Sequence, residues 1–232
     1  MSVRAERRQL TGHRSVARRG GGISLTGKRV LDVVAATLLV IVLAPVAAVI
    51  MVAIWLTMGR PVLFLQERPG SGERPFVLRK FRTMSNAYDV DGQLLPDKER
   101  LTPVGRFLRS TSLDELPQLV NILQGEMSFI GPRPLLMRYL PDFTERERAR
   151  FVMRPGLTGW AQIHGRNVLS WDQRLELDAW YVSNWSLWLD ARIACRTVSI
   201  LIRRDGYSED PNSLMANLDD ERQNRIKRNQ VP

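Results

Sequence analysis

The stretch that decides the fold runs from Val33 to Met58 and reads VVAATLLVIVLAPVAAVIMVAIWLTM. It contains no charged residue. A helix of this length spans about 39 Å at 1.5 Å per residue. Because the hydrocarbon core of a bilayer is about 30 Å thick, length and composition together predict a membrane helix.

Pro45 lies at the centre of this run. It has no amide hydrogen and its ring clashes with the preceding turn, so we expect a kink near Leu43 and Ala44. The kink gives two arms of about 18 Å, each long enough to reach the middle of the bilayer and turn back. A straight span is the alternative, since proline is well tolerated in spanning helices.

Both flanks of the run are basic. The basic residues upstream are Arg4, Arg7, Arg8, Arg14, Arg18, Arg19, Lys28 and Arg29, and those downstream are Arg60, Arg68, Arg74, Arg79, Lys80 and Arg82. Basic flanks prefer the cytoplasmic side, so neither flank resembles an outer end. Charge therefore favours a re-entrant helix, and a span with a basic outer end stays open as the alternative.

The amino-acid composition limits the classes of partner that the chain is expected to bind. Its 232 residues leave room for one domain besides the apolar run, and 34 Lys+Arg against 24 Asp+Glu give a net charge of +10. This excess points to an anionic membrane face, phosphorylated substrates or nucleic acid. Nucleic acid is poorly supported, because the aromatic residues gather in apolar stripes. Cys195 is the only cysteine, which excludes an internal disulfide and a thiolate metal cluster.

Four segments follow from these patterns. Residues 1–26 are a basic, disordered N-terminus, 27–59 the membrane helix, 60–206 a globular domain and 207–232 a polar, disordered tail. Within the domain, apolar runs at 62–65 and 76–78 flank a Pro-Gly turn and predict a hairpin or two extended pieces. Residues 171–204 have helical spacing. Arginines beside the last apolar stripe fit either an interfacial helix or a core-packing amphipathic helix.

Two adjacent carboxylates, Asp114 and Glu115, stand at a predicted helix start. We prefer Asp114 as the N-cap, with Pro117 in the first turn; Ser112 with Glu115 in a capping box is the alternative. Acids in a first turn are ordinarily explained by the helix dipole. Consecutive helical positions point about 100° apart, however, so one carboxylate can hold a divalent cation while the other meets the substrate.

Several cations lie in short turns. Arg133 stands between Pro132 and Pro134, where a stiff backbone suits a guanidinium that clamps phosphate. Lys80, Arg82 and Arg154 lie in comparable turns. Each alone is ordinarily a solvated surface charge, but together with the acidic pair in a membrane-bound chain they suggest chemistry on a diphosphate. Neither His13 nor His164 has an acid and a nucleophile beside it in sequence, which argues against a histidine-based triad.

The string STSLDELPQLVNILQGEMSFIGPRPL, residues 110–135, resembles the signature of the bacterial sugar transferase family, the monotopic polyprenol-phosphate phosphoglycosyl transferases. Similar elements follow the family order: KRVLD at 28–32, KFRTM at 80–84, RPGLTGWAQ at 154–162 and YVSNWS at 181–186. The resemblance covers about 27 to 206. A match of this length and order is specific, whereas Asp-Glu alone would not be.

The resemblance implies a mainly α fold with short β pieces. A re-entrant membrane helix kinked at Pro45 and interfacial amphipathic helices would pack on a small cytosolic catalytic domain, at the cytoplasmic face of the bacterial inner membrane. The family breaks this helix at a Ser-Pro pair, and here the pair is Ala44-Pro45. The missing hydroxyl leaves the bend less well fixed.

The resemblance also implies a reaction. Asp114 would be the nucleophile that attacks the β-phosphate of a UDP-sugar and releases UMP, and a polyprenyl phosphate would then take the phosphosugar. Asp114 and Glu115 would bind Mg²⁺, and Lys80, Arg82, Arg133 and Arg154 would hold phosphate or nucleotide. This would be the first membrane step in making a polysaccharide or glycoconjugate. A hypothesis from another class is a non-catalytic bitopic adaptor whose basic domain binds anionic lipid or nucleic acid.

Overall fold

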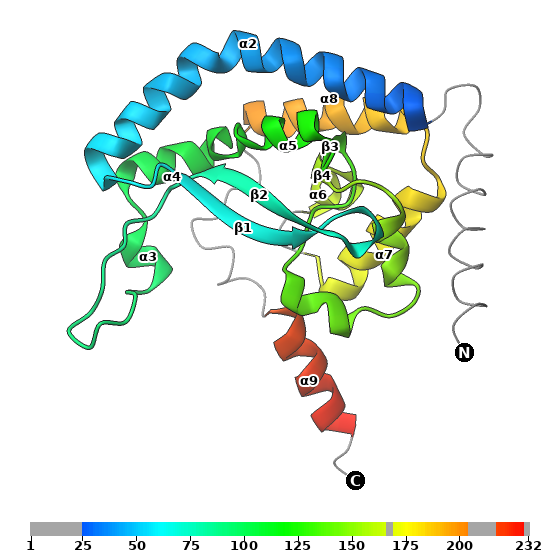
Figure 1. Cartoon of the computed structure of the whole chain (residues 1–232). Coiled ribbons are helices and arrows are strands. Elements are labelled where there is room, and N and C mark those ends of the chain that lie inside the picture. Colours follow the sequence, from blue (N-terminus) through cyan, green and yellow to red (C-terminus); the bar gives the residue numbers. More distant parts are fainter. Residues whose placement is uncertain (1–24, 166–168, 204–216, 230–232) are drawn as a thin grey trace.

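The computed structural model describes residues 25–165, 169–203 and 217–229, which are mainly helical with two small sheets, as predicted (Figure 1). The basic N-terminal segment lies outside the described residues as far as residue 24. The predicted tail is partly described. Residues 218–229, expected to be disordered, instead form helix α9, Leu218–Asn229. This prediction was wrong because Leu218 is fully buried and ion pairs hold the helix against the domain.

Helix α2, Leu25–Met58, contains the whole apolar run and stays helical through Pro45. In Figure 1 it forms an arch over the rest of the molecule. Among the described residues it is the one helix long and apolar enough to cross a membrane, and only 11% of its most apolar window is buried. This exposure is unlike a core helix and supports membrane association. The re-entrant course stays a prediction.

Both ends of α2 attach to the same domain. At the first end, Lys28 Nζ lies 2.5 Å from Asp190 Oδ2, and Asp32 accepts a hydrogen bond from the Phe129 amide at 3.2 Å. At the second end, Ile50 and Ile54 are buried in a cluster with Phe81 and Leu108. The arch is therefore fixed to the domain at both of its ends.

The predicted hairpin is confirmed. Strands β1, Leu63–Pro69, and β2, Pro75–Phe81, pair antiparallel from Leu63↔Phe81 to Pro69↔Pro75. Strands β3, Ser128–Ile130, and β4, Gly156–Thr158, pair in parallel. A Cβ on Gly156 would lie 2.1 Å from the Gly131 nitrogen, so this close backbone contact requires glycine.

Short helices lie between these strands, and one short and two longer helices follow the last strand before α9. They are α3 (Asp97–Arg100), α4 (Pro103–Ser110), α5 (Gln118–Gln124), α6 (Trp160–Gly165), α7 (Trp171–Ser183) and α8 (Leu187–Arg203). The 3-10 turns are η1 (Ser71–Glu73), η2 (Leu113–Glu115), η3 (Met137–Asp142) and η4 (Glu147–Val152).

Helix α8 lies beside α2 in Figure 1 and has two faces. Leu189 and Ile193 are buried in the core with Tyr181 and Trp185. Its other face exposes apolar side chains, namely Trp188, Val198, Leu201 and Ile202. Helix α8 is therefore a core-packing helix that also presents an apolar surface next to the exposed side chains of α2.

Candidate active site

The acidic pair lies in the 3-10 turn η2, between α4 and α5. Asp114 is buried, and its neighbours Leu113 and Leu116 pack against the second arm of α2. The predicted cap at Asp114 is wrong, and so is the alternative at Ser112. Ser112 has a left-handed backbone (φ 57°) and makes no cap hydrogen bond, and α5 begins only at Gln118, after Pro117. The left-handed residue separates η2 from α4 and turns both carboxylates into the site.

Two predicted cations meet this pair. Lys80, on β2, places Nζ 2.7 Å from Glu115 Oε1 and 3.7 Å from Asp114 Oδ2. Arg133, after β3, places Nη2 2.7 Å from the same Glu115 oxygen. Residues far apart in sequence are thus gathered into one site of alternating charge. Lys80 reaches this site from strand β2, and the predicted turn at Lys80 is wrong.

The backbone around Arg133 is fixed from both sides. The Gly131 amide donates to the Thr158 carbonyl at 2.9 Å, and the Gly156 amide donates to the Pro132 carbonyl at 2.9 Å. Arg150 also donates a hydrogen bond to the carbonyl of Arg133. The guanidinium of Arg133 is therefore presented from a rigid turn, which reduces the entropy lost on binding an anion.

The two carboxylates differ electrostatically. Burial raises the pKa of Asp114, and Glu115 raises it further, although Lys80, Arg133 and Arg109 oppose this. Burial also disfavours the charge on Glu115, but Arg133 and Lys80 together outweigh burial and hold the pKa of Glu115 well below its usual range. Glu115 is therefore a stably ionised partner of the cations, whereas Asp114 is the more basic carboxylate of the pair.

Arg82 and Arg154 have other neighbours. Arg82 is buried and donates to the carbonyls of Met84 at 2.9 Å and Met58 at 3.4 Å, so it holds the exit of α2, although it also lines the cavity of the acidic pair. Arg154 donates to the Gly125 carbonyl at 2.8 Å and does not line that cavity. The structure groups Arg82 with the site and leaves Arg154 outside it, and phosphate binding by either stays a prediction.

The acidic pair opens into a cavity of about 1830 Å³ with two kinds of lining. Charged side chains surround Asp114, and apolar side chains of α2 and α8 line the rest, including Leu31, Leu39, Ala194 and Val198. A single cavity thus joins a polar site to the two helices that expose apolar surface. It suits a ligand or ligand pair that combines an anionic group with a hydrocarbon chain.

Further charged residues in this cavity were not predicted. Arg150 and Asp178 form a buried ion pair at 2.9 Å, and burial raises the pKa of Asp178 to about 6. Burial and the nearby Arg133 lower the pKa of Arg68 to about 10. Arg109 and Arg174 line the same space. In sequence these residues belong to strand or helix patterns and carry no local signal of a site.

Mg²⁺ binding by Asp114 and Glu115 stays a prediction. Among the described residues, no group of three or more His, Cys, Asp and Glu side chains is placed to hold a metal ion. Mg²⁺ is commonly bound by one or two carboxylates together with substrate phosphates, and Asp114 and Glu115 supply two such donors on the cavity wall.

Comparison with known proteins identifies related chains. The sequence pattern of the family described as "Bacterial sugar transferase" matches residues 23–204. The chain is 48% identical over 182 residues to "Uncharacterized sugar transferase EpsL" of Bacillus subtilis, covering 78% of this chain and 90% of that protein. It is 44% identical over 189 residues to a "UDP-glucose:undecaprenyl-phosphate glucose-1-phosphate transferase" of Caulobacter vibrioides, covering 77% and 70%.

A third relative is longer. The chain is 36% identical over 199 residues to an "Undecaprenyl-phosphate galactose phosphotransferase" of Salmonella typhimurium. The match covers 77% of this chain but 41% of that protein. The family pattern spans the acidic pair, Lys80 and Arg133 and ends before α9.

Proposed function

Because the chain belongs to the bacterial sugar transferase family, we propose that it transfers a sugar 1-phosphate from a UDP-sugar to a polyprenyl phosphate. The names of the Caulobacter and Salmonella relatives support undecaprenyl phosphate as the acceptor. The observation that carries the proposal is the buried carboxylate of Asp114, set among cations in a cavity that continues between apolar helices. A non-catalytic adaptor gives no reason for this arrangement.

In the first step, a carboxylate oxygen of Asp114 attacks the β-phosphorus of the UDP-sugar. The bond from that phosphorus to the oxygen bridging the two phosphates breaks, and UMP leaves with the bond electrons. Lys80 and Arg133 offset the repulsion between the carboxylate and the diphosphate. The raised pKa of Asp114 is favourable here, because a more basic carboxylate is a better nucleophile once ionised.

In the second step, a phosphate oxygen of the polyprenyl phosphate attacks the phosphorus held on Asp114. The bond between phosphorus and the Asp114 oxygen breaks, which regenerates the carboxylate and gives a polyprenyl diphosphate sugar. Glu115 keeps Lys80 and Arg133 in place through both displacements. Mg²⁺, when bound by Asp114, Glu115 and substrate phosphate, would neutralise part of the diphosphate charge.

The attachment of α2 supports a re-entrant course. A helix that crosses the bilayer leaves its ends on opposite sides, but here Lys28 pairs with Asp190 and Met58 accepts from Arg82 of the same domain. We place this domain at the cytoplasmic face of the bacterial inner membrane, in agreement with the basic flanks of α2. A soluble donor and a lipid acceptor then meet at the interface, where Asp114 lies.

A UMP-release assay tests the function. The full chain in nanodiscs is incubated with Mg²⁺, undecaprenyl phosphate and either UDP-glucose or UDP-galactose. Asp114→Asn removes the nucleophile and should lower UMP release by about 10³-fold or more. Asp91→Asn makes the same chemical change at an exposed residue outside the cavity and should keep full activity. Full activity in Asp114→Asn would remove the proposed nucleophile.

A further inference from the structure

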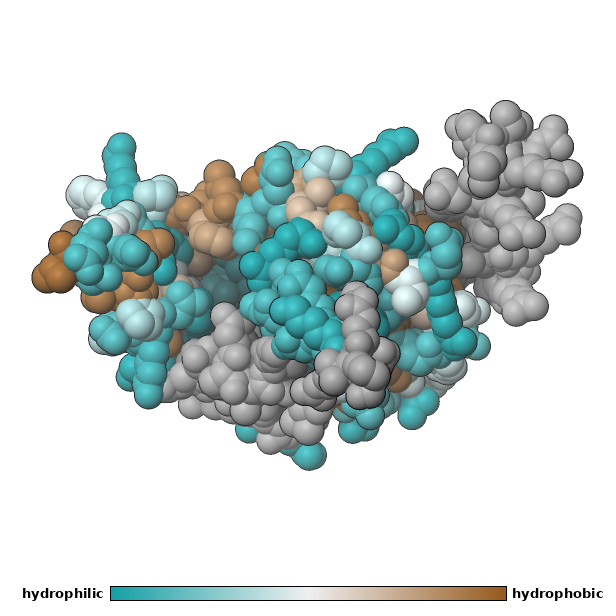
Figure 2. Space-filling view, turned by 90° about the horizontal axis from the view of Figure 1, so that it is seen from below, coloured by the Kyte–Doolittle hydropathy of each residue, from teal (hydrophilic) through white to brown (hydrophobic). Residues whose placement is uncertain are grey.

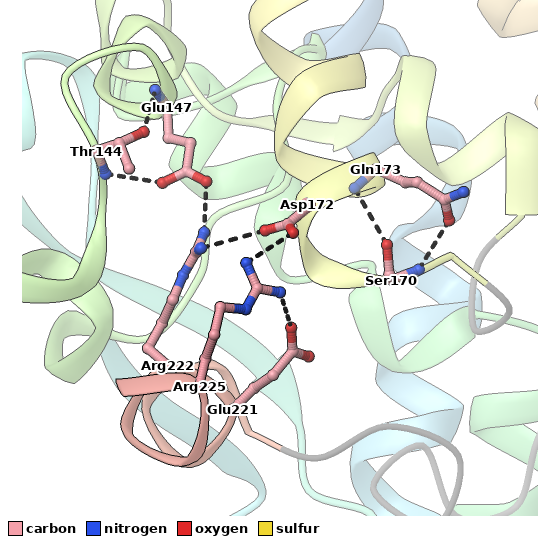
Figure 3. A network of polar contacts seen from close by, with 8 residues as sticks. All are labelled: Thr144, Glu147, Ser170, Asp172, Gln173, Glu221, Arg222 and Arg225. Atoms are coloured by element: carbon pink, nitrogen blue, oxygen red, sulfur yellow. Dashed lines mark hydrogen bonds and ion pairs between the residues drawn. The ribbon is translucent and has the colours of Figure 1, made fainter. Parts of the chain in front are cut away.

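Helix α9 is docked on the domain by a network of ion pairs (Figure 3). Arg222 reaches Glu147 at 2.5 Å and Asp172 at 3.2 Å, and Arg225 reaches Asp172 at 2.9 Å. The side chains of Arg222 and Glu147 are only 17% and 12% exposed. Leu218, at the start of the helix, is fully buried in the cluster of η3, η4 and α7 residues. The helix is thus bound to the domain by both charge and apolar contact.

The start of α9 also reaches the substrate cavity. Asn217, Arg138 and Tyr139 line the same cavity as Asp114. The Tyr139 hydroxyl donates to Asn217 Oδ1 at 3.2 Å, and Arg138 Nε lies 3.2 Å from Asp219 Oδ2. Two cavity-lining side chains of η3 are therefore held by residues at the start of α9.

The part of the cavity lined by Asn217, Arg138 and Tyr139, here called the α9 wall, lies away from α2 and α8. In Figure 1, α9 lies at the opposite side of the molecule from α2 and α8. Figure 2 looks onto the molecule from below, and the coloured surface of that view is largely hydrophilic. The match to the family ends at residue 204, so α9 lies beyond it. We therefore expect a soluble substrate to bind on the side of α9, a helix that the family pattern does not include.

Cations connect the acidic pair to this wall. Arg133 contacts Glu115, and Arg68 and Arg174 line the same cavity. The guanidinium of Arg174 lies 5.0 Å from the Trp171 ring, and that ring packs edge-on against Tyr139 with the centroids 5.5 Å apart. A diphosphate that begins at Asp114 can thus follow positive charge toward Tyr139 and Arg138.

We propose that Arg138 and Tyr139 bind the nucleotide of the donor substrate, and that α9 positions them through Asp219 and Asn217. The inference rests on the proposed function. In an in-line displacement the leaving group lies opposite the attacking oxygen, so UMP extends away from Asp114. The polar wall at α9 receives it, while the hydrocarbon chain of the acceptor lies on the side of α2 and α8. Arg222 is a positioning residue in this arrangement.

The test is UDP binding, measured by isothermal titration calorimetry on the full chain in nanodiscs with Mg²⁺. Arg138→Ala should weaken UDP affinity about tenfold, since it removes a charge-assisted contact. Arg222→Ala should weaken it several-fold, because α9 loses its ion pairs with Glu147 and Asp172. Arg222→Lys should recover part of the affinity. Lys98→Ala removes an exposed cation of α3 that does not line the cavity, and it should bind UDP as the native chain does.

Kinetic measurements distinguish a loss of nucleotide positioning from a general loss of structure in the Arg222 variant. Arg222→Ala should raise KM for the UDP-sugar, while kcat and KM for undecaprenyl phosphate change less than about twofold. If Arg222→Ala does not fold, Asn217→Ala keeps the ion pairs of α9 and should still weaken UDP binding. Equal UDP affinity in Arg138→Ala, Asn217→Ala and the native chain would overturn the inference. UDP binding without UMP release from any UDP-sugar would instead overturn the proposed function.

Discussion

Helices α2 and α9 lie on opposite sides of the molecule (Figure 1) and are attached to the domain by different means. Helix α2 is fixed by buried contacts, among them the ion pair of Lys28 and Asp190, and exposes apolar side chains along its length. Helix α9 is fixed by the buried Leu218 and by ion pairs, of which those of Arg225 are about half exposed. The difference suggests that the lipid side is a permanent scaffold, whereas the aqueous side is held by contacts that solvent can weaken.

The largest stability effect is expected at the α2 attachment. Asp190 is 10% exposed and accepts from Lys28, from the Tyr181 hydroxyl at 2.7 Å and from Trp185 Nε1 at 3.1 Å. Lys28→Met leaves this carboxylate buried without its counter-ion and should lower the free energy of unfolding by about 3–5 kcal/mol. Thermal unfolding in nanodiscs measures the change. Arg222→Ala, at the partly exposed attachment of α9, should cost only about 1–2 kcal/mol.

Two further variants check that the buried pair is the cause. Lys98→Met removes an exposed lysine and should leave the melting temperature unchanged. Adding Asp190→Asn to Lys28→Met removes the uncompensated charge and should restore part of the loss. If Lys28→Met destabilises no more than Arg222→Ala, the proposed contrast between the two attachments is wrong.

A smaller effect is expected on the pH dependence of kcat/KM, which the acidic pair controls. We expect kcat/KM to change about tenfold per pH unit on the acidic side of the profile. Because burial raises the pKa of Asp114, kcat/KM should be level above that pKa and fall as pH drops through it. Glu115 stays ionised across this range, since Arg133 and Lys80 hold its pKa well below the usual value. A raised carboxyl pKa favours the folded state at low pH, and this contribution is lost as pH rises through the pKa of Asp114.

Lys80 provides the check on this pH dependence. It opposes the upward shift in the pKa of Asp114, so Lys80→Met should move the acidic limb of kcat/KM to higher pH as well as lower the maximum rate. The pH profile of UMP release measures both. If the acidic limb of the Lys80→Met profile stays at the same pH, the ionisation that causes this limb is not that of Asp114.

The sequence predicts those parts of the fold that local patterns determine. The apolar run gives α2, short apolar runs around a Pro-Gly turn give β1 and β2, and helical spacing gives α7 and α8. The turn at Asp114 was missed because a left-handed Ser112 interrupts the helix, and serine carries no strong signal for that conformation. Helix α9 was missed because its composition is polar, and its docking depends on distant partners such as Glu147.

The sequence singled out Asp114, Glu115 and Arg133 because they lie in or next to turns. Lys80 meets them from within strand β2, where the sequence placed a turn. The rest of the cavity lining comes from the interiors of strands and helices, including Arg68, Arg150, Arg174 and Asp178. Tertiary packing alone brings these residues together, and no spacing in a single sequence indicates it.

The central claim is that Asp114 carries the phosphosugar between two displacements. Intact-protein mass spectrometry after incubation with Mg²⁺ and a UDP-sugar, without lipid acceptor, tests it most directly. The account predicts a mass increase of one phosphosugar on the native chain, absent from Asp114→Asn and lost when undecaprenyl phosphate is added. An active native chain that gains no mass and releases UMP only when both substrates are present would contradict it.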